Sequence, residues 1–173
     1  PVIFFEPKRI YNGPFDGDPD KPAIGWSSHP GGEVPDGYYS IPLGEAAVVE
    51  AGDDLSIITY GTMVHVAQAA VRKAGISADI IDVRSLVPLD MQTILSSVAR
   101  THRLFTVEEN PRLCGWGAEL VSIVADEAFY DLDGPPVRIT TPHIPLPSAD
   151  LLEDAVLPNV ERIAETVRRS LGS

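Results

Sequence analysis

A carboxylate and a guanidinium that each follow an apolar run could do chemistry at the ends of two strands. Glu108 and Glu109 come directly after the apolar residues 104–107. Side chains alternate between the two faces of a strand, so these neighbours point to opposite sides and predict no paired-carboxylate site. Glu108 alone could act as a general acid or base, or have a buried hydrogen-bonding or subunit-contact role. Arg84 also follows an apolar run, so we expect Arg84 and Glu108 at one crevice.

Two glycines mark a second candidate site. Gly115 and Gly117 flank Trp116 just before a helical pattern of apolar residues. The N-terminus of such a helix could hold an anion, or the glycines could let the helix approach the sheet closely. No Gly-x-Gly-x-x-Gly string, nucleophile elbow or phosphate loop occurs, which argues against dinucleotide binding.

Histidine and cysteine give little support for metal or thiol chemistry. His29, His65, His102 and His143 are far apart, without the short spacing of a zinc site. Cys114 precedes a helix, a setting that could lower a thiol pKa, but no partner histidine is identifiable, so we interpret it as a small packing residue. We therefore assign no catalytic, cofactor-binding or metal-binding residue to this chain.

Composition limits the class of protein. The 173 residues are 44% hydrophobic and carry a formal net charge of −12, which would repel both a nucleic-acid backbone and anionic lipid. We therefore expect neither nucleic acid nor membrane as a partner. The single cysteine, and the lack of a signal-peptide pattern, favour a reducing compartment and thus a cytoplasmic location.

The elements that must position these residues alternate between strand and helix. Strands are expected at 55–61, 79–83, 103–108 and 137–140, and helices at 64–75, 90–101, 117–129 and 159–171. Asn159 is the expected N-cap of the last helix. This alternation predicts an α/β fold with a doubly wound, mainly parallel sheet and helices on both faces. Ligands of such folds usually bind at the carboxyl ends of the strands.

The first 52 residues differ in character from the rest. An apolar run at 1–8 reads as a strand, the last of a domain that lies upstream. Residues 9–52 are rich in turn signals such as Asn12-Gly13-Pro14 and predict a long irregular linker. Residues 53–173 form the predicted α/β domain.

Four strings carry a resemblance to a known family. They are VIFFEPKRIY at 2–11, GYYSIPLGEA at 37–46, YGTMVH at 60–65 and IDVRSLVPLD at 81–90. In this order and spacing, the chain resembles the C-terminal portion of the β subunits of thiamine-dependent branched-chain 2-oxoacid dehydrogenases. The resemblance covers essentially the whole chain and implies a transketolase-type C-terminal domain at 53–173. It also implies that residues 1–8 end a pyrimidine-binding domain.

The resemblance further implies an activity and partners. The intact enzyme would oxidatively decarboxylate branched-chain 2-oxo acids and pass the acyl group to a dihydrolipoyl acyltransferase. Thiamine diphosphate and Mg²⁺ would be bound by an α2β2 assembly of α subunits and two β subunits. In the family the groups that act on the cofactor lie upstream or on the α subunit, so this segment is expected to bind no cofactor and to be inactive alone.

An acidic segment near the end suggests a docking role. Asp150, Glu153 and Asp154, with the carboxylate of Ser173, could receive a basic domain of the acyltransferase. A merely solvated acidic turn is the alternative. Residues 150–158 look more like the pyruvate and acetoin members of the family, which leaves a pyruvate or acetoin dehydrogenase β subunit open. A non-catalytic interaction module is the remaining alternative.

Overall fold

The computed structural model describes residues 1–7 and 35–172. The chain divides into two compact units, Pro1–Pro42 and Leu43–Ser173. In the first unit the described residues form no helix or strand. The strand expected at 1–8 is thus not formed over 1–7, because a strand needs a neighbour that shares its backbone hydrogen bonds. Lys8 and residues 9–34 of the expected linker lie outside the described residues.

The second unit is built on a five-stranded sheet with the order β1-β3-β2-β4-β5. The strands are β1 (Ala47–Glu50), β2 (Leu55–Thr59), β3 (Ala78–Asp82), β4 (Leu104–Pro111) and β5 (Val137–Thr141). β1 pairs with β3 in the antiparallel sense, and every other pairing is parallel. The mainly parallel sheet is therefore confirmed, with one strand more than the sequence patterns indicate.

The additional strand lies within the range expected to be linker. β1 has only four residues at the edge of the sheet, and both of its central valines are partly exposed. Its register with β3 is interrupted between Val48 and Glu50. A strand this short and irregular has too little alternation to be distinguished from a loop by its sequence pattern.

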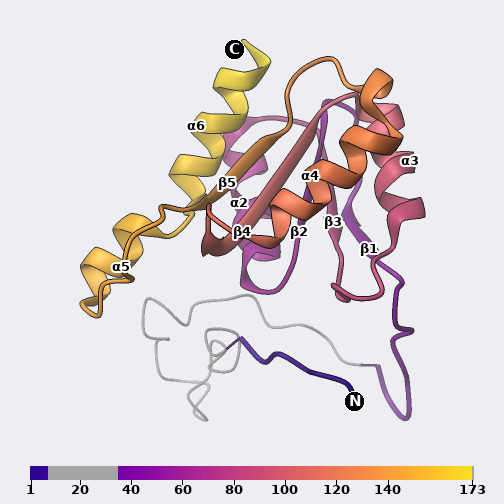
Figure 1. Cartoon of the computed structure of the whole chain (residues 1–173), viewed down its shortest axis with the longest axis horizontal. Coiled ribbons are helices and arrows are strands. Elements are labelled where there is room, and N and C mark those ends of the chain that lie inside the picture. Colours follow the sequence, from indigo (N-terminus) through magenta and orange to yellow (C-terminus); the bar gives the residue numbers. More distant parts are fainter. Residues whose placement is uncertain (8–34, 173) are drawn as a thin grey trace. The chain divides into compact units, whose positions relative to one another are not determined.

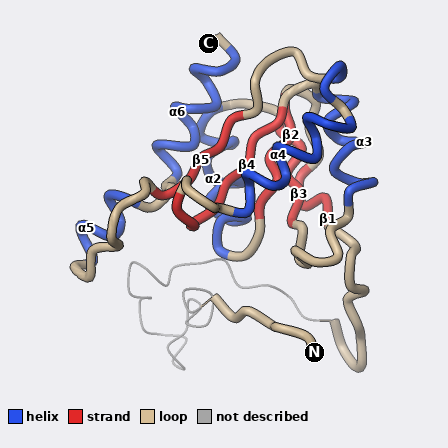
Figure 2. Tube along the Cα trace, viewed as in Figure 1, coloured by secondary structure: helices blue, strands red, loops and turns tan. Residues whose placement is uncertain are grey.

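Helices cover both faces of the sheet, as Figures 1 and 2 show. They are α2 (Thr62–Ala74), α3 (Met91–Thr101), α4 (Trp116–Glu127), α5 (Asp150–Val156) and α6 (Val160–Leu171), with a 3₁₀ turn η2 (Phe129–Asp131). α2 and α6 pack on one face, and α3 and α4 on the other. The doubly wound arrangement is confirmed. In the described part of the chain, no helix has the length and apolar character needed to span a membrane.

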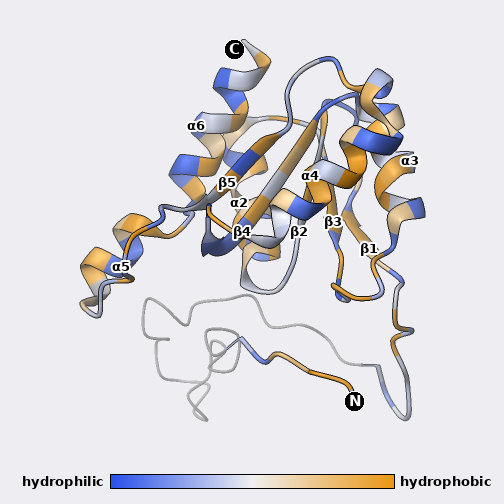
Figure 3. Cartoon of the chain, viewed as in Figure 1, coloured by the Kyte–Doolittle hydropathy of each residue, from blue (hydrophilic) through white to orange (hydrophobic). Residues whose placement is uncertain are grey.

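Each central strand contributes side chains to two cores. Ile57 of β2 belongs to the cluster under α2 and α6, whereas its neighbour Ile58 belongs to the cluster under α3 and α4. Ile80 and Ile81 of β3 are divided in the same way. Figure 3 shows these strands as mostly hydrophobic. Burial on both faces explains why each of these strands has two adjacent isoleucines where a half-buried strand would alternate apolar and polar residues.

Helix ends agree with the sequence signals. Asn159 accepts a hydrogen bond from the Arg162 backbone N–H at 2.9 Å, which confirms it as the N-cap of α6. Asp90 caps α3 through the Thr93 N–H at 3.1 Å and also accepts from the Ala46 N–H at 2.9 Å. One carboxylate thereby begins α3 and fixes the chain entering β1.

Candidate functional site

The topology places a switch point between the carboxyl ends of β2 and β4. β2 leads into α2 on one face and β3 leads into α3 on the other, so the winding reverses between the adjacent strands β2 and β4. Doubly wound folds bind ligands at such a switch point. Tyr60 and Thr62 follow β2 here, and Glu108 lies near the end of β4.

Glu108 is a buried hydrogen-bonding hub at this switch point. Its exposed fraction is 1%. One carboxylate oxygen, Oε1, accepts a hydrogen bond from the Gly117 backbone N–H at 2.9 Å and lies 3.6 Å from an Arg138 guanidinium nitrogen. The other, Oε2, accepts from Asn110 Nδ2 at 3.4 Å. The geometry supports the buried hydrogen-bonding role over a general acid or base, because no part of the carboxylate reaches solvent.

The carboxylate of Glu108 also replaces the missing cap of α4. The N-cap residue Gly115 has no side chain to offer, and a helix start needs an acceptor for its first free N–H groups. Glu108 supplies that acceptor from β4, and its negative charge is favourable at the positive end of the helix dipole. The anion that the glycine turn could hold is therefore part of the same chain.

The two glycines are there because α4 lies very close to β4. A Cβ atom on Gly117 would lie 2.5 Å from Thr106 Oγ1 and 2.8 Å from Glu108 Oε1. One on Gly115 would lie 2.6 Å from the Pro111 carbonyl oxygen. All three distances are too short for a side chain, so of the two roles considered for these glycines the close approach of helix to sheet is confirmed.

Two aromatic side chains also lie at the switch point. Tyr60 and Trp116 meet edge to face, with ring centroids 5.4 Å apart at 87°. The Tyr60 hydroxyl accepts a hydrogen bond from Asn110 Nδ2 at 2.8 Å. Asn110 thus joins Tyr60 to Glu108, and the chain's own side chains occupy the switch point.

Burial raises the pKa of Tyr60 above its ordinary value, and the negative charges of Glu108 and Glu109 raise it further. Because the folded-state pKa exceeds the unfolded value of about 10, the resulting stability is fully present below pH 10. It is lost as the pH rises through the folded-state value. We expect an absorbance titration of the native chain minus that of Tyr60→Phe to show ionisation only well above pH 10. A difference step at or below pH 10 would contradict this environment.

Arg84 and Glu108 lie at different strands of the sheet. Arg84 follows β3, and β2 separates β3 from β4 in the sheet. Its side chain is exposed, and its backbone, at φ 51°, donates to Asp82 Oδ1 at 3.1 Å. Burial raises the pKa of Asp82, opposed by that hydrogen bond and by the charge of Arg84. Strand order therefore places the two residues at the same edge of the sheet, near the ends of strands that are not neighbours.

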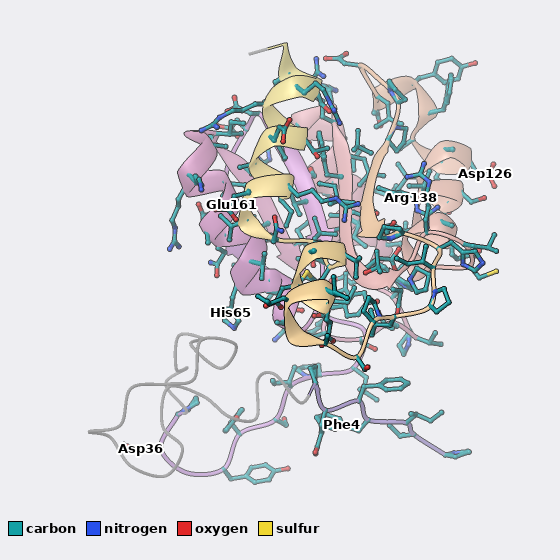
Figure 4. All side chains as sticks on the ribbon, turned by 90° about the vertical axis from the view of Figure 1, so that its left-hand side faces the viewer. Phe4, Asp36, His65, Asp126, Arg138 and Glu161 are labelled. Atoms are coloured by element: carbon teal, nitrogen blue, oxygen red, sulfur yellow. The ribbon has the colours of Figure 1, made fainter. Side chains whose placement is uncertain are left out.

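Cys114 and the histidines form no reactive centre in the described residues. Cys114 is exposed, so its interpretation as a packing residue is wrong: the turn at φ 59° carries it away from the core. His65 on α2 is labelled in Figure 4 and lies well apart from Arg138 on β5. Over residues 1–7 and 35–172, no three His, Cys, Asp or Glu side chains gather into a potential metal site. His29 lies outside that part of the chain.

Three of the four members of the predicted docking set lie on one helix. Asp150, Glu153 and Asp154 all lie on α5. Ser173 lies outside the described residues and follows Gly172, the C-cap of α6. α6 has 12 residues and therefore extends about 18 Å. Figure 1 shows α5 beside the start of α6, with the C-terminus at the far end. The three acidic residues thus share one helix.

The sequence places Tyr60 and Asn110 at this edge of the sheet but indicates no role for them, and it does not single out Arg138. Tyr60 follows β2 and Asn110 lies near the end of β4, and tyrosine and asparagine have many ordinary roles in such places. The position of Arg138 could have indicated a role in the interior, since it is a charged residue between the apolar residues Val137 and Ile139 of β5. A buried cation requires a buried partner, and that partner is Glu108.

The fold agrees with a match to a known protein family. Residues 44–163 match the family model described as "Transketolase, C-terminal domain". The chain belongs to the transketolase C-terminal domain family. A solved chain described as "Split gene transketolase, inactive beta4 tetramer" has a similar fold, with a TM-score of 0.66 at 22% identity. That match covers 78% of this chain and 44% of the solved chain.

Curated relatives narrow the comparison within this family. The 2-oxoisovalerate dehydrogenase subunit beta of Pseudomonas aeruginosa is 50% identical over 98% of this chain and 48% of its own length. The acetoin:2,6-dichlorophenolindophenol oxidoreductase subunit beta of Cupriavidus necator is 40% identical over 99% of this chain and 46% of its own length. The pyruvate dehydrogenase E1 component subunit beta of Bacillus subtilis is 41% identical over 80% of this chain and 43% of its own length. The chain thus spans about half the length of these relatives.

Proposed function

We propose that this chain is the C-terminal part of a 2-oxoacid dehydrogenase β subunit that acts on branched-chain 2-oxo acids. The observation that carries the proposal is 50% identity to a 2-oxoisovalerate dehydrogenase β subunit along 98% of the chain. The acetoin and pyruvate β subunits reach 40% and 41%. In the intact enzyme the substrate is decarboxylated and its acyl group passes to a dihydrolipoyl acyltransferase.

We further propose that the cofactor of this reaction, thiamine diphosphate with Mg²⁺, is bound outside this segment. The residues at the switch point do not fit a diphosphate. The N-terminus of α4, the natural place for such an anion, is already bonded to the carboxylate of Glu108. A diphosphate there would meet a like charge with no space between helix and strand. The segment's own role is then structural: it completes the β subunit and supports its assembly with an α subunit.

Two measurements test this function. The isolated chain, given thiamine diphosphate and Mg²⁺, is expected to release no carbon dioxide from 2-oxoisovalerate. The α2β2 assembly reconstituted from the full β subunit that carries this chain is expected to prefer 2-oxoisovalerate over pyruvate and acetoin. A preference for pyruvate or acetoin would reassign the substrate, and turnover by the isolated chain would reject the structural role.

A second candidate function is the docking of a basic domain of the acyltransferase on α5. The supporting observation is the charge of this region. Residues 139–161 contain no Lys or Arg, whereas Asp150, Glu153 and Asp154 lie on one short helix. Complementary charge mainly raises the rate of association and is screened by salt.

Charge reversal on α5 tests the docking. The double substitution of Asp150→Lys and Glu153→Lys is expected to weaken acyltransferase binding about tenfold or more at low salt and much less at high salt. Asp126→Lys with Glu127→Lys makes the same charge change on α4, and should leave the affinity nearly unchanged. Titrations at two salt concentrations measure both. Unchanged affinity of the α5 variant at low salt would reject the docking.

A further inference from the structure

A small cavity lies at the edge of the sheet opposite to the switch point. Its walls come from the start of β4, from the residues around the start of β5 and from the end of α6, and its volume is about 130 Å³. β4 and β5 are parallel, so their amino ends meet here and their carboxyl ends lie at the other edge. Figure 1 shows the end of α6 on the same side of the domain as the loop that leads into β5.

The apolar walls of the cavity belong to the core. Phe105 and Val137 are register partners on β4 and β5, and both pack in the cluster under α2 and α6. Pro135, in the loop before β5, adds a further apolar surface. A ligand bound here would therefore contact side chains that core packing already holds in place.

One cationic side chain joins these apolar walls. Arg103 lies two residues before Phe105, so alternation along the extended chain places both side chains on the same face of the sheet. Its Nη1 donates to the Ser170 carbonyl oxygen at 3.0 Å, which fixes the guanidinium against the end of α6. That bond uses one of the five N–H groups of the guanidinium. Among the described residues that line the cavity, Arg103 alone is charged.

From this lining we infer that the cavity binds a short branched-chain carboxylate such as isobutyrate. Its aliphatic end would lie on Phe105 and Val137, and its carboxylate would accept hydrogen bonds from Arg103, whose planar fork matches a carboxylate. A cavity of about 150 Å³ holds one benzene molecule, so this one takes about six non-hydrogen atoms, the size of isobutyrate. The inference does not depend on the proposed function, because it follows from the lining alone.

The same walls disfavour two other small ligands. Inorganic phosphate would bring a more highly charged anion against Phe105 and Val137, where it would lose hydration without enough donors to replace it. An uncharged alcohol of the same shape would fit the apolar walls but would gain no charge-assisted hydrogen bond from Arg103. Only the carboxylate uses both kinds of wall.

Titration of isobutyrate into the isotope-labelled chain, followed by NMR, tests the site. The signals of Phe105 and Val137 are expected to shift and to saturate with a dissociation constant of about 1–10 mM, since so small a ligand gains little binding free energy. Isobutanol is expected to bind at least about fivefold more weakly. Phosphate is expected to leave both signals in place.

Substitutions of two arginines make the test specific. Arg103→Met removes the guanidinium, and is expected to weaken isobutyrate binding about tenfold or more, as is typical for a charged hydrogen bond. Arg169→Met removes the same charge from an exposed position in the last turn of α6, and should leave the affinity unchanged. Arg103→Lys keeps the charge but loses the fork. Its affinity should fall between the two, and it replaces the methionine variant if thermal unfolding shows that variant to be unfolded.

Three results on the chain would overturn the inference. They are the absence of saturable shifts, an equal affinity for isobutanol, and equal effects of the substitutions at Arg103 and Arg169. The same titration on the full β subunit that carries this chain is expected to give the same dissociation constant. Loss of binding there would show that the cavity is filled in the whole subunit, and would also overturn the inference. Neither titration involves the α subunit or turnover, so a failure of the proposed function would leave their results unchanged.

Discussion

Gly117→Ala is expected to destabilise the chain by about 1–2 kcal/mol, although alanine is the better helix former. The new Cβ would lie 2.5 Å from Thr106 Oγ1 and 2.8 Å from Glu108 Oε1. Thr106 is fully buried in β4, and Glu108 is held by its hydrogen bonds, so neither can yield cheaply. Overpacking of this kind typically costs about 1–3 kcal/mol, which outweighs the helix preference of about 1 kcal/mol. Denaturant unfolding of the purified chain measures the change.

Gly134→Ala is the matched control for this substitution. A Cβ there meets nothing within 4 Å, and the residue does not need a positive φ. We expect its free energy of unfolding to stay within about 0.5 kcal/mol of the native value, or to rise slightly through reduced unfolded-state entropy. Equal stability of Gly117→Ala and Gly134→Ala would show that α4 is not in close contact with β4.

Glu108→Ala is expected to lower the free energy of unfolding by about 3 kcal/mol. The substitution leaves the Gly117 N–H without its acceptor and Arg138, whose side chain is only 15% exposed, without its ion-pair partner. Removing one partner of a buried pair costs about 3–5 kcal/mol. The partial exposure of Arg138 places the expectation at the lower end of that range. Glu108→Gln should lower the free energy of unfolding by less, because its amide oxygen can still accept a hydrogen bond from the Gly117 N–H.

Two comparisons make this prediction specific to Glu108. Glu119→Ala removes an exposed carboxylate from the first turn of the same helix, and only the dipole effect of about 0.3–1 kcal/mol should be lost. Combining Glu108→Ala with Arg138→Met should cost less than the sum of the two single changes, because the second removes the charge that the first left unpaired. Strict additivity would show that the two side chains do not act as a pair.

Neither substitution is expected to alter the chemistry of the assembly directly. Glu108 has no solvent-exposed atom through which a substrate could be reached, and Gly117 contributes only backbone. Their effects should appear as reduced amounts of folded subunit, with turnover per assembled enzyme preserved. Measuring activity against the concentration of intact assembly distinguishes this from a catalytic defect.

The elements with strong periodicity were predictable because local patterns decide them. β2 and β3 are buried on both faces, so each has two adjacent isoleucines at its centre, between turn signals. α6 carries its core residues at helical spacing and has an asparagine at its start. β1 and α5 were missed because one is a short edge strand and the other is seven residues of exposed leucines and acids.

The sequence by itself determined the doubly wound α/β class and the mainly parallel sheet. Only the tertiary structure decided which side chains meet at the switch point. Strand order places β2 between β3 and β4, which keeps Arg84 apart from Glu108. The parallel register of β4 and β5 brings Arg138 to Glu108 across 30 positions of chain. Such long-range pairings depend on strand order and register, which no local pattern of residues encodes.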